Sequence, residues 1–236
     1  MTFISKKLLI GTVAAVALGF SACSAASNAA SDVANEAASA TKSAASDAVS
    51  AVKDVALKPA ANIGDAPSGV YKSEAGHAYI AMSYDHQGYA KPILRWGAFD
   101  ATVNVDSENP ENSSLSVEID VASIDSGVDA FDDHLRAEQF FNVAEYPTIS
   151  FNSTDMKQLV QGRGQVTGEL TIKDITKPVT LDVTLNKVGK NFRSKKDMFG
   201  ISATTMIRRD DFGVGRYDIV GQEVEIQIEV EFIKAD

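Results

Sequence analysis

Apolar and polar residues alternate with a period of two from His77 to the C-terminal end of the chain. The last such segment is the clearest, because Val224, Ile226 and Ile228 share one face while glutamate or glutamine fills the positions between them. A period of two places successive side chains on opposite faces of a β-strand, so each segment is predicted to have one apolar and one wet face. The alternating segments are 77–84, 94–106, 115–121, 149–152, 166–172, 179–185, 199–207 and 224–232.

These segments predict an all-β domain of eight antiparallel strands, because strands with one wet face are typical of antiparallel sheets. Eight strands can close into a barrel, which removes exposed sheet edges and either fills with side chains or holds one small ligand. Two packed sheets would show the same alternation. The pattern by itself therefore leaves barrel and sandwich open.

The stretch 129–154 contains an interruption of the alternation, which lies before its strand at 149–152. It contains a charged cluster, Asp132-Asp133-His134-Leu135-Arg136, followed by the aromatic pair Phe140-Phe141. Helical spacing of its apolar residues predicts a helix within about 130–144, and Pro147 ends it because proline removes a backbone donor. We expect a helix and loop lying across one end of the strands, with an aspartate capping or charging the first turn.

The first 22 residues have the layout of a secretory signal peptide. Lys6 and Lys7 precede an apolar run from Leu8 to Phe20, which is too short for a comfortable membrane span. Cys23 follows and is the one cysteine of the chain, so no intrachain disulfide can form. It is either discarded with the signal peptide or kept as a modified residue.

The residues around Cys23 resemble a bacterial lipobox, although Phe20 stands where leucine is usual. That resemblance implies cleavage before Cys23 and attachment of a diacylglyceryl group to its sulfur, which would anchor the protein to a membrane. Ser24, in place of an aspartate after the cysteine, implies the outer membrane as destination. The expectation is thus an exported, periplasmic protein held at the outer membrane by its N-terminal lipid.

Residues 23–68 are predicted to be a tether. Alanine and serine dominate the segment and no aromatic residue occurs in it, so it cannot bury enough apolar surface to fold alone. A short amphipathic or coiled-coil helix is the alternative, because alanine favours helix. The predicted organisation is a signal peptide over 1–22, the tether over 23–68 and one folded domain over 69–236.

The net charge of −10 argues against nucleic acid as a partner, because the phosphates would be repelled. The sequence shows no basic patch and no lysine-rich amphipathic helix. Contact with anionic lipid headgroups would therefore have to be local.

No catalytic constellation emerges from the sequence. Cysteine is absent after Cys23, a Gly-x-Ser-x-Gly elbow is missing, and His77, His86 and His134 lie far apart. No metal site, cofactor or catalytic residue is predicted on this basis. Asp132 and His134 could do acid–base work, but a carboxylate in the first turn of a helix has an ordinary structural role. Each arginine beside an acid is more simply a surface ion pair.

Several separated motifs resemble the YceI family of bacterial secreted proteins, over about 69–232. They are D-x-H-L-R at 132–136, F-F at 140–141, Y-P-x-I-x-F-x-S-T at 146–154, G-A-F at 97–99, G-E-L-T-I-K at 168–173, T-K-P-V-T-L at 176–181 and R-x-D-F-G at 209–213. The resemblance implies a lipocalin-like barrel that holds a polyisoprenoid chain, and it favours the barrel over the sandwich. Phe131 stands where the family often has an arginine, so no role of that arginine is carried over.

The leading hypothesis is a binding protein that sequesters or carries an isoprenoid or other long-chain lipid in the barrel. The predicted lumen residues are Ile80, Met82, Phe99, Val103, Ile119, Phe151, Leu170, Leu181, Ile201 and Ile228, with Phe140 and Phe141 guarding the mouth. The predicted headgroup or mouth residues are Asp132, His134, Arg136 and Arg208.

Two other hypotheses remain. A solidly packed barrel could present a surface to a partner protein of the cell envelope. An enzyme acting on isoprenoid or quinone substrates ranks last, because no mechanism can be assigned.

Overall fold

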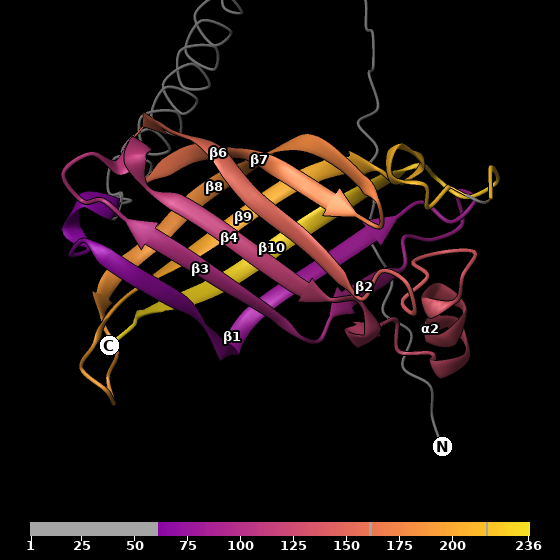
Figure 1. Cartoon of the computed structure of the whole chain (residues 1–236), viewed down its shortest axis with the longest axis horizontal. Coiled ribbons are helices and arrows are strands. Elements are labelled where there is room, and N and C mark those ends of the chain that lie inside the picture. Colours follow the sequence, from indigo (N-terminus) through magenta and orange to yellow (C-terminus); the bar gives the residue numbers. More distant parts are fainter. Residues whose placement is uncertain (1–60, 161, 216) are drawn as a thin grey trace, which may run out of the picture. The chain divides into compact units, whose positions relative to one another are not determined.

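The alternating segments form antiparallel strands that close on themselves in the computed structural model, which describes residues 61–160, 162–215 and 217–236 (Figure 1). Neighbours in the barrel follow the order β10–β9–β8–β7–β6–β4–β3–β1, and pairing of β1 with β10 closes the ring. The eight long strands are β1 (Gly69–Tyr84), β3 (Phe99–Val105), β4 (Ser114–Asp120), β6 (Thr148–Val160), β7 (Arg163–Ile172), β8 (Ile175–Lys190), β9 (Asp197–Arg208) and β10 (Glu223–Lys234). The expected eight-stranded antiparallel barrel is confirmed, and the sandwich alternative is wrong.

Two short strands lengthen one side of the barrel. The edge of β1 pairs first with β3 and then with β2 (Ile93–Trp96), so β2 and β3 are two parts of one interrupted strand. β5 (Ile124–Asp125) continues β4 in the same way, because it pairs with β2. The sequence pattern predicted 94–106 as one strand. The interruption lies at Gly97, whose N–H donates to the carbonyl of Ser123 instead of to a ladder partner.

Val121 was predicted as the end of a strand but begins the 3-10 helix η3 (Val121–Ser123). The side chain of Asp120 accepts a hydrogen bond from the N–H of Ala122 and thereby caps this turn. The side chain of Val121 is buried nonetheless. Alternation therefore gave the correct burial for Val121 and the wrong backbone.

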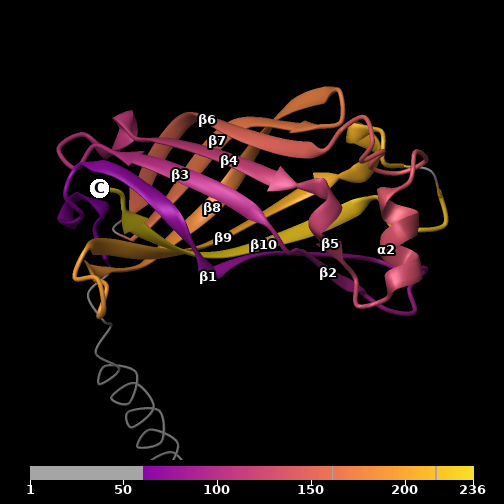
Figure 2. The same ribbon diagram turned by 60° about the horizontal axis from the view of Figure 1, so that its bottom comes forward.

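The inserted stretch forms α2 (Asp129–Arg136), which lies at one end of the barrel beside β5 (Figure 2). The helix is shorter than the expected 130–144, because Ala137 is extended and Asn142 takes a left-handed φ of 51°. Asp129 and Asp132 lie in its first turn, which favours negative charge. The expected aspartate cap is wrong: Val128 occupies the cap position and makes no side-chain hydrogen bond there.

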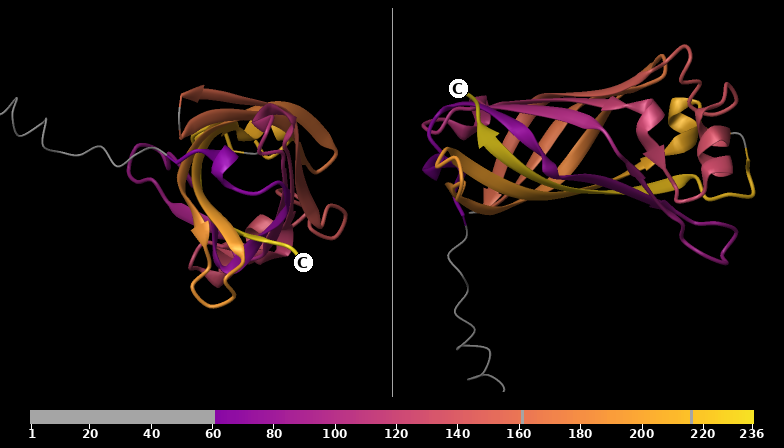
Figure 3. Two further views of the ribbon diagram at one scale, coloured as in Figure 1. Left: turned by 90° about the vertical axis from the view of Figure 1, so that its left-hand side faces the viewer. Right: turned by 90° about the horizontal axis from the view of Figure 1, so that it is seen from below.

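The opposite end of the barrel carries the C-terminus and residues 61–68 (Figures 1 and 3). Here the 3-10 helix η1 (Ile63–Asp65) contacts β8, and Ala66 is 1% exposed. Residues 61–68 thus pack on the barrel, so the described folded region includes residues before Gly69, where the sequence pattern set the start of the domain. A segment without aromatic residues folds here because the barrel supplies the apolar surface. Cys23, the signal peptide and the rest of the tether lie outside the described residues.

The Tyr71 hydroxyl holds this first segment to the barrel. It donates to the carbonyl of Pro67 at 2.7 Å, and its side chain is fully buried. Tyr71→Phe is expected to lower the free energy of unfolding of the 58–236 fragment by about 1 kcal/mol, because the carbonyl loses its partner. Urea denaturation measures the change. Tyr79→Phe is the matched control, since Tyr79 is 55% exposed, and an equal loss in both variants would contradict the role of Tyr71.

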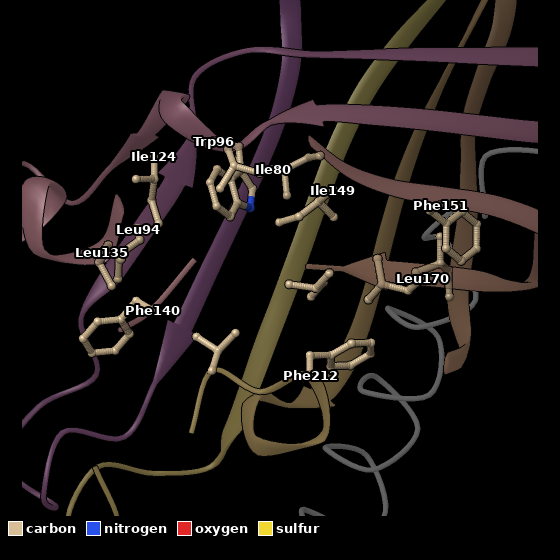
Figure 4. Packing of buried hydrophobic residues seen from close by; sticks show 14 residues of the cluster. Ile80, Leu94, Trp96, Ile124, Leu135, Phe140, Ile149, Phe151, Leu170 and Phe212 are labelled. Atoms are coloured by element: carbon tan, nitrogen blue, oxygen red, sulfur yellow. The ribbon is translucent and has the colours of Figure 1, made fainter. Parts of the chain in front are cut away.

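Two buried clusters occupy the two halves of the barrel. The larger lies toward α2, where Figure 4 shows Leu135 and Phe140 beside Leu94 and Ile124. The smaller lies at the opposite end and is centred on Tyr71. Short 3-10 turns, η2 (Pro110–Asn112) and η4 (Arg209–Phe212), connect strands at the two ends. Among the described residues, no helix has the length and hydropathy needed to cross a bilayer.

Candidate functional site

The inward side chains of the barrel leave a cavity of about 670 Å³. It is lined by residues from all eight long strands, together with β2, β5, α2 and η4. Cavities of this size are typical of small-molecule sites, which lie mostly in the range of about 300–1,000 Å³. The packed-barrel hypothesis requires a lumen filled by the side chains of the barrel. The cavity shows that the lumen is not filled in this way.

Strand alternation explains which residues face this cavity, because every second residue of a barrel strand points inward. The structure places all twelve predicted lumen and mouth-guarding side chains on the cavity wall. They are Ile80, Met82, Phe99, Val103, Ile119, Phe140, Phe141, Phe151, Leu170, Leu181, Ile201 and Ile228. That these side chains touch a ligand remains a prediction.

Gly168 shows how small residues shape the wall. It takes an inward position of β7, and a Cβ built on it would lie 2.5 Å from the ring of Phe151 and 2.5 Å from the carbonyl oxygen of Asn152. The ring of Phe151 therefore lies across Gly168, where any other residue would displace it. Ala101 and Ala203 are also on the wall and keep it thin there.

Aromatic side chains close the cavity at the α2 end. The rings of Trp96 and Phe141 meet edge to face with centroids 5.3 Å apart, and His134 meets Phe140 in the same way at 4.8 Å. His134 also stacks on Tyr217 at 6.3 Å. Edge-to-face pairs are a favourable aromatic geometry, so these rings support one another at the mouth.

Among the four predicted mouth residues, His134 alone lines the cavity. Asp132 is 6% exposed and accepts hydrogen bonds from the N–H and the hydroxyl of Ser126, at 2.8 and 2.6 Å. Arg136 donates to the carbonyls of Ala122 and Ile124. Asp132 and Arg136 thus attach α2 to the loop before it and to η3 and β5, so they position the mouth without facing the cavity.

Arg208 is also misplaced by the prediction. It follows the inward residue Ile207 and points outward, where its guanidinium pairs with Asp210 at 2.8 Å. The turn η4 then brings Arg209 back onto the cavity wall. The arginine at the α2 end of the lumen is therefore Arg209, one residue further along the chain.

Arg209 organises the loop between η4 and β10. Its guanidinium donates to the backbone carbonyls of Val214, Tyr217, Val220 and Gly221. Burial lowers the pKa of this guanidinium, and the negative charges of Asp210 and Asp218 oppose the shift. An arginine stays protonated in proteins even so, which means that a positive charge stands at the mouth of an apolar cavity.

Tyr84 lines the cavity close to this charge. Burial raises the pKa of its hydroxyl, and the positive charge of Arg209 partly opposes that rise. The mouth thus combines a hydroxyl, an imidazole and a guanidinium around apolar walls. Such groups suit the polar end of an amphiphile.

Polar residues also reach the cavity at the opposite end, near the β6–β7 turn. Glu111, Ser113, Gln158 and Arg163 belong to its lining there. Sequence reasoning did not find them, because they lie in turns and at a strand irregularity between Gln158 and Val160 that breaks the period of two. The lining is therefore apolar along its length and polar toward both ends.

Asp132→Ala is expected to lower the free energy of unfolding by about 2 kcal/mol, because the variant leaves the N–H of Ser126 without its charged acceptor. Asp133→Ala is the matched control on the same helix. The Asp133 side chain is 81% exposed, and its ion pair with Arg136 is worth at most about 1 kcal/mol. Chemical denaturation of both variants measures the difference. Equal losses would show that Asp132 does not hold the helix.

Within the described residues, no group of three or more histidine, cysteine, aspartate or glutamate side chains could hold a metal ion. The three histidines are dispersed. His77 pairs with Glu74 at 2.6 Å on the outer surface, His86 lies in the turn after β1, and His134 lies on α2. The geometry therefore offers a binding cavity and assigns no reaction.

Comparison with known sequences adds a family to this geometry. A family model described as a YceI-like domain matches residues 71–232. A UPF0312 protein of Pseudomonas putida is 34% identical over 173 residues, which are 72% of this chain and 90% of the relative. A UPF0312 protein of Yersinia enterocolitica is 33% identical over 180 residues, which cover 73% of this chain and 90% of the relative.

Solved structures agree with the barrel. BcnA of Burkholderia cenocepacia is similar with a TM-score of 0.61 and 25% identity, over 67% of this chain and 98% of its own. A polyisoprenoid binding domain from Saccharophagus degradans has a TM-score of 0.54, over 72% of this chain and 100% of its own. At 9% identity, this second likeness shows the fold alone.

Proposed function

This chain belongs to the family of the YceI-like domain, and we propose that its barrel binds the apolar chain of an isoprenoid-type or similar long-chain lipid. The observation that carries the proposal is the long cavity of about 670 Å³ with polar groups confined to its ends. An amphiphile matches that distribution, because its tail needs dry walls and its headgroup needs polar partners. The isoprenoid class is proposed from the YceI-like motifs of the sequence, and a solved neighbour of the same fold is described as a polyisoprenoid binding domain.

Burial of the tail supplies the driving force. Each methylene-sized group removed from water contributes about 0.8 kcal/mol, so a five-carbon isoprene unit contributes about 4 kcal/mol before costs. Association loses about 4–15 kcal/mol of translational and rotational freedom and of ordering. A chain of several units offsets that loss, whereas a single unit does not. The proposal therefore requires a long ligand.

At the polar end we assign His134, Tyr84 and Arg209 to the headgroup. These three side chains line the α2 end of the cavity from three separate elements. A guanidinium donates to phosphate or carbonyl oxygens, while the imidazole and the phenol can donate or accept. The role is binding and orientation, and no chemical step is assigned.

The proposed setting is the cell envelope. The signal-peptide layout of residues 1–22 and the lipobox-like residues before Cys23 support export and acylation. A lipid anchor at Cys23 would hold the protein at the outer membrane, facing the periplasm. Incorporation of labelled palmitate that persists in Cys23→Ser would contradict this part of the proposal and leave the cavity untouched.

Native mass spectrometry tests the binding proposal. The 58–236 fragment, exported to a bacterial periplasm and purified without detergent, is expected to carry a stoichiometric adduct that solvent extracts as a polyisoprenoid. A bare mass that stays unchanged after incubation with polyprenyl lipids and quinones would overturn the proposal. That result would favour the alternative hypothesis, a barrel that acts through contacts with a partner protein.

A further inference from the structure

The hairpin between β8 and β9 is strongly basic. Its residues 187–197 include five cations and one acid, in a chain whose net charge is −10. The cations are Lys187, Lys190, Arg193, Lys195 and Lys196, and the acid is Asp197. This cluster corrects the sequence-based statement that the chain has no basic patch. The charges stand out once the strand pairing folds them onto one projecting turn.

The loop of the hairpin has a defined conformation. The side chain of Asn191 accepts hydrogen bonds from the N–H groups of Arg193 and Ser194, each at 3.0 Å. Its backbone N–H donates to the carbonyl of Lys196, and its carbonyl accepts from the N–H of Lys195. These bonds hold the backbone of the tip in one conformation.

An aromatic ring stands at this tip. Phe192 is 74% exposed, although a phenylalanine of a folded protein is ordinarily buried. The guanidinium of Arg193 lies 5.2 Å from the centre of the ring. An exposed ring beside cations is the combination found where proteins enter the headgroup region of a membrane.

Three of the five cations lack an acidic partner in the described part of the chain. Lys190 pairs with Asp197 at 2.6 Å, and Lys196 pairs with Asp236 at 2.6 Å. Lys187, Arg193 and Lys195 are exposed and are found in no ion pair among residues 61–160, 162–215 and 217–236. Their charges are therefore available to an external anionic surface.

The position of the hairpin adds a second argument. It lies at the end of the barrel opposite α2, where β1 begins and β10 ends (Figures 1 and 3). The strand that leads into it, β8, contacts η1, which is the first described element of the chain. The hairpin and the point at which the N-terminal part of the chain joins the barrel are therefore on the same end.

We infer that the β8–β9 hairpin binds the surface of a membrane that contains anionic phospholipid. Phe192 enters the headgroup layer, and Lys187, Arg193 and Lys195 contact lipid phosphates. Nucleic acid fits less well, because the rest of this acidic protein would be repelled along an extended polyanion. A bilayer would contact only the tip of the hairpin, so the acidic remainder of the protein would not lie against it. The inference is independent of what the cavity holds.

Vesicle flotation of the 58–236 fragment tests the inference, because this fragment lacks the apolar run and Cys23. The native fragment is expected to float with vesicles of phosphatidylcholine mixed with phosphatidylglycerol, and not with phosphatidylcholine alone. Raising the ionic strength from about 0.1 M to about 1 M should release it, because the Debye length falls from about 10 Å to about 3 Å.

A triple variant, Lys187→Gln, Arg193→Gln and Lys195→Gln, is expected to bind about a hundredfold more weakly, because each cation near an anionic surface contributes about a factor of five. The matched control, Lys91→Gln, Arg95→Gln and Lys177→Gln, removes the same charge at the α2 end and should bind as the native fragment does. Phe192→Ser, added to the triple variant or to the control variant, should weaken the membrane binding of that variant.

Circular dichroism and thermal unfolding establish that each variant is folded before flotation. Failure of the native fragment to float, or equal binding by the hairpin variant and its control, would overturn the inference. Equal binding to neutral and anionic vesicles would do the same. A lipid adduct in the cavity, measured on the same samples, reports the binding proposal separately.

Discussion

Arg209→Met is expected to lower the free energy of unfolding of the barrel by about 3 kcal/mol and to open the α2 end of the cavity. The guanidinium of Arg209 donates to four backbone carbonyls between Val214 and Gly221. Hydrogen bonds to a charged donor contribute about 1.5–3 kcal/mol each, although losses within one network do not add. Methionine keeps the apolar stem of the side chain and removes every donor.

Arg208→Met is the matched control for this change. Arg208 is adjacent in sequence, but its side chain is half-exposed and forms an ion pair with Asp210 on the outer surface. Arg208→Met is expected to change the free energy of unfolding by no more than about 0.5 kcal/mol, as most surface substitutions do. Urea denaturation gives both free energies, and proteolysis of the 213–222 loop reports its opening. Equal effects of the two substitutions would refute the assignment of Arg209 as the organiser of the mouth.

Val183→Trp is expected to weaken retention of a long-chain lipid by about tenfold to a hundredfold. Val183 of β8 lines the cavity, and its neighbours on the two adjacent strands are the small residues Gly164 of β7 and Ala203 of β9. Because these neighbours are small, a larger ring at position 183 has space to project into the lumen. The indole then occupies volume that the tail would fill. Overpacking costs about 1–3 kcal/mol, and 1.4 kcal/mol is a tenfold change in affinity.

Thr184→Trp separates a filled lumen from a disturbed strand. Thr184 is the next residue of β8, pairs with Ser202 and does not line the cavity. It should retain the lipid as the native fragment does, while both variants keep the native far-ultraviolet spectrum. Native mass spectrometry measures the bound fraction in each. Full retention in folded Val183→Trp would show that the ligand does not use this part of the lumen.

The inward faces of the strands were predictable because they depend on a local property. A strand has a period of two whatever it pairs with, so Ile201 or Ile228 can be assigned to the lumen from its neighbours in sequence. Closure was not local in this sense. It depends on pairing of β1 with β10, strands at the two ends of the folded domain, and alternation is the same with or without that pairing.

The mouth was harder to predict because it is built from turns. Arg208 and Arg209 are adjacent and chemically identical, and the turn η4 decides which of them faces the lumen. Asp132 was placed at the mouth for its charge, but burial against Ser126 makes it a structural acceptor. Turn geometry arises from hydrogen bonds with residues that no periodic pattern identifies.

The sequence by itself determined the strands, their apolar faces, the family resemblance and the acidic character of the chain, because each depends on residue order or composition alone. The tertiary structure decided the closed ring, the volume left inside it and the end at which each polar group lies. It also folded residues 61–68 onto the barrel and gathered the basic hairpin on that same end. Those features require residues distant in sequence to meet, and the distances between such residues are set by packing rather than by pattern.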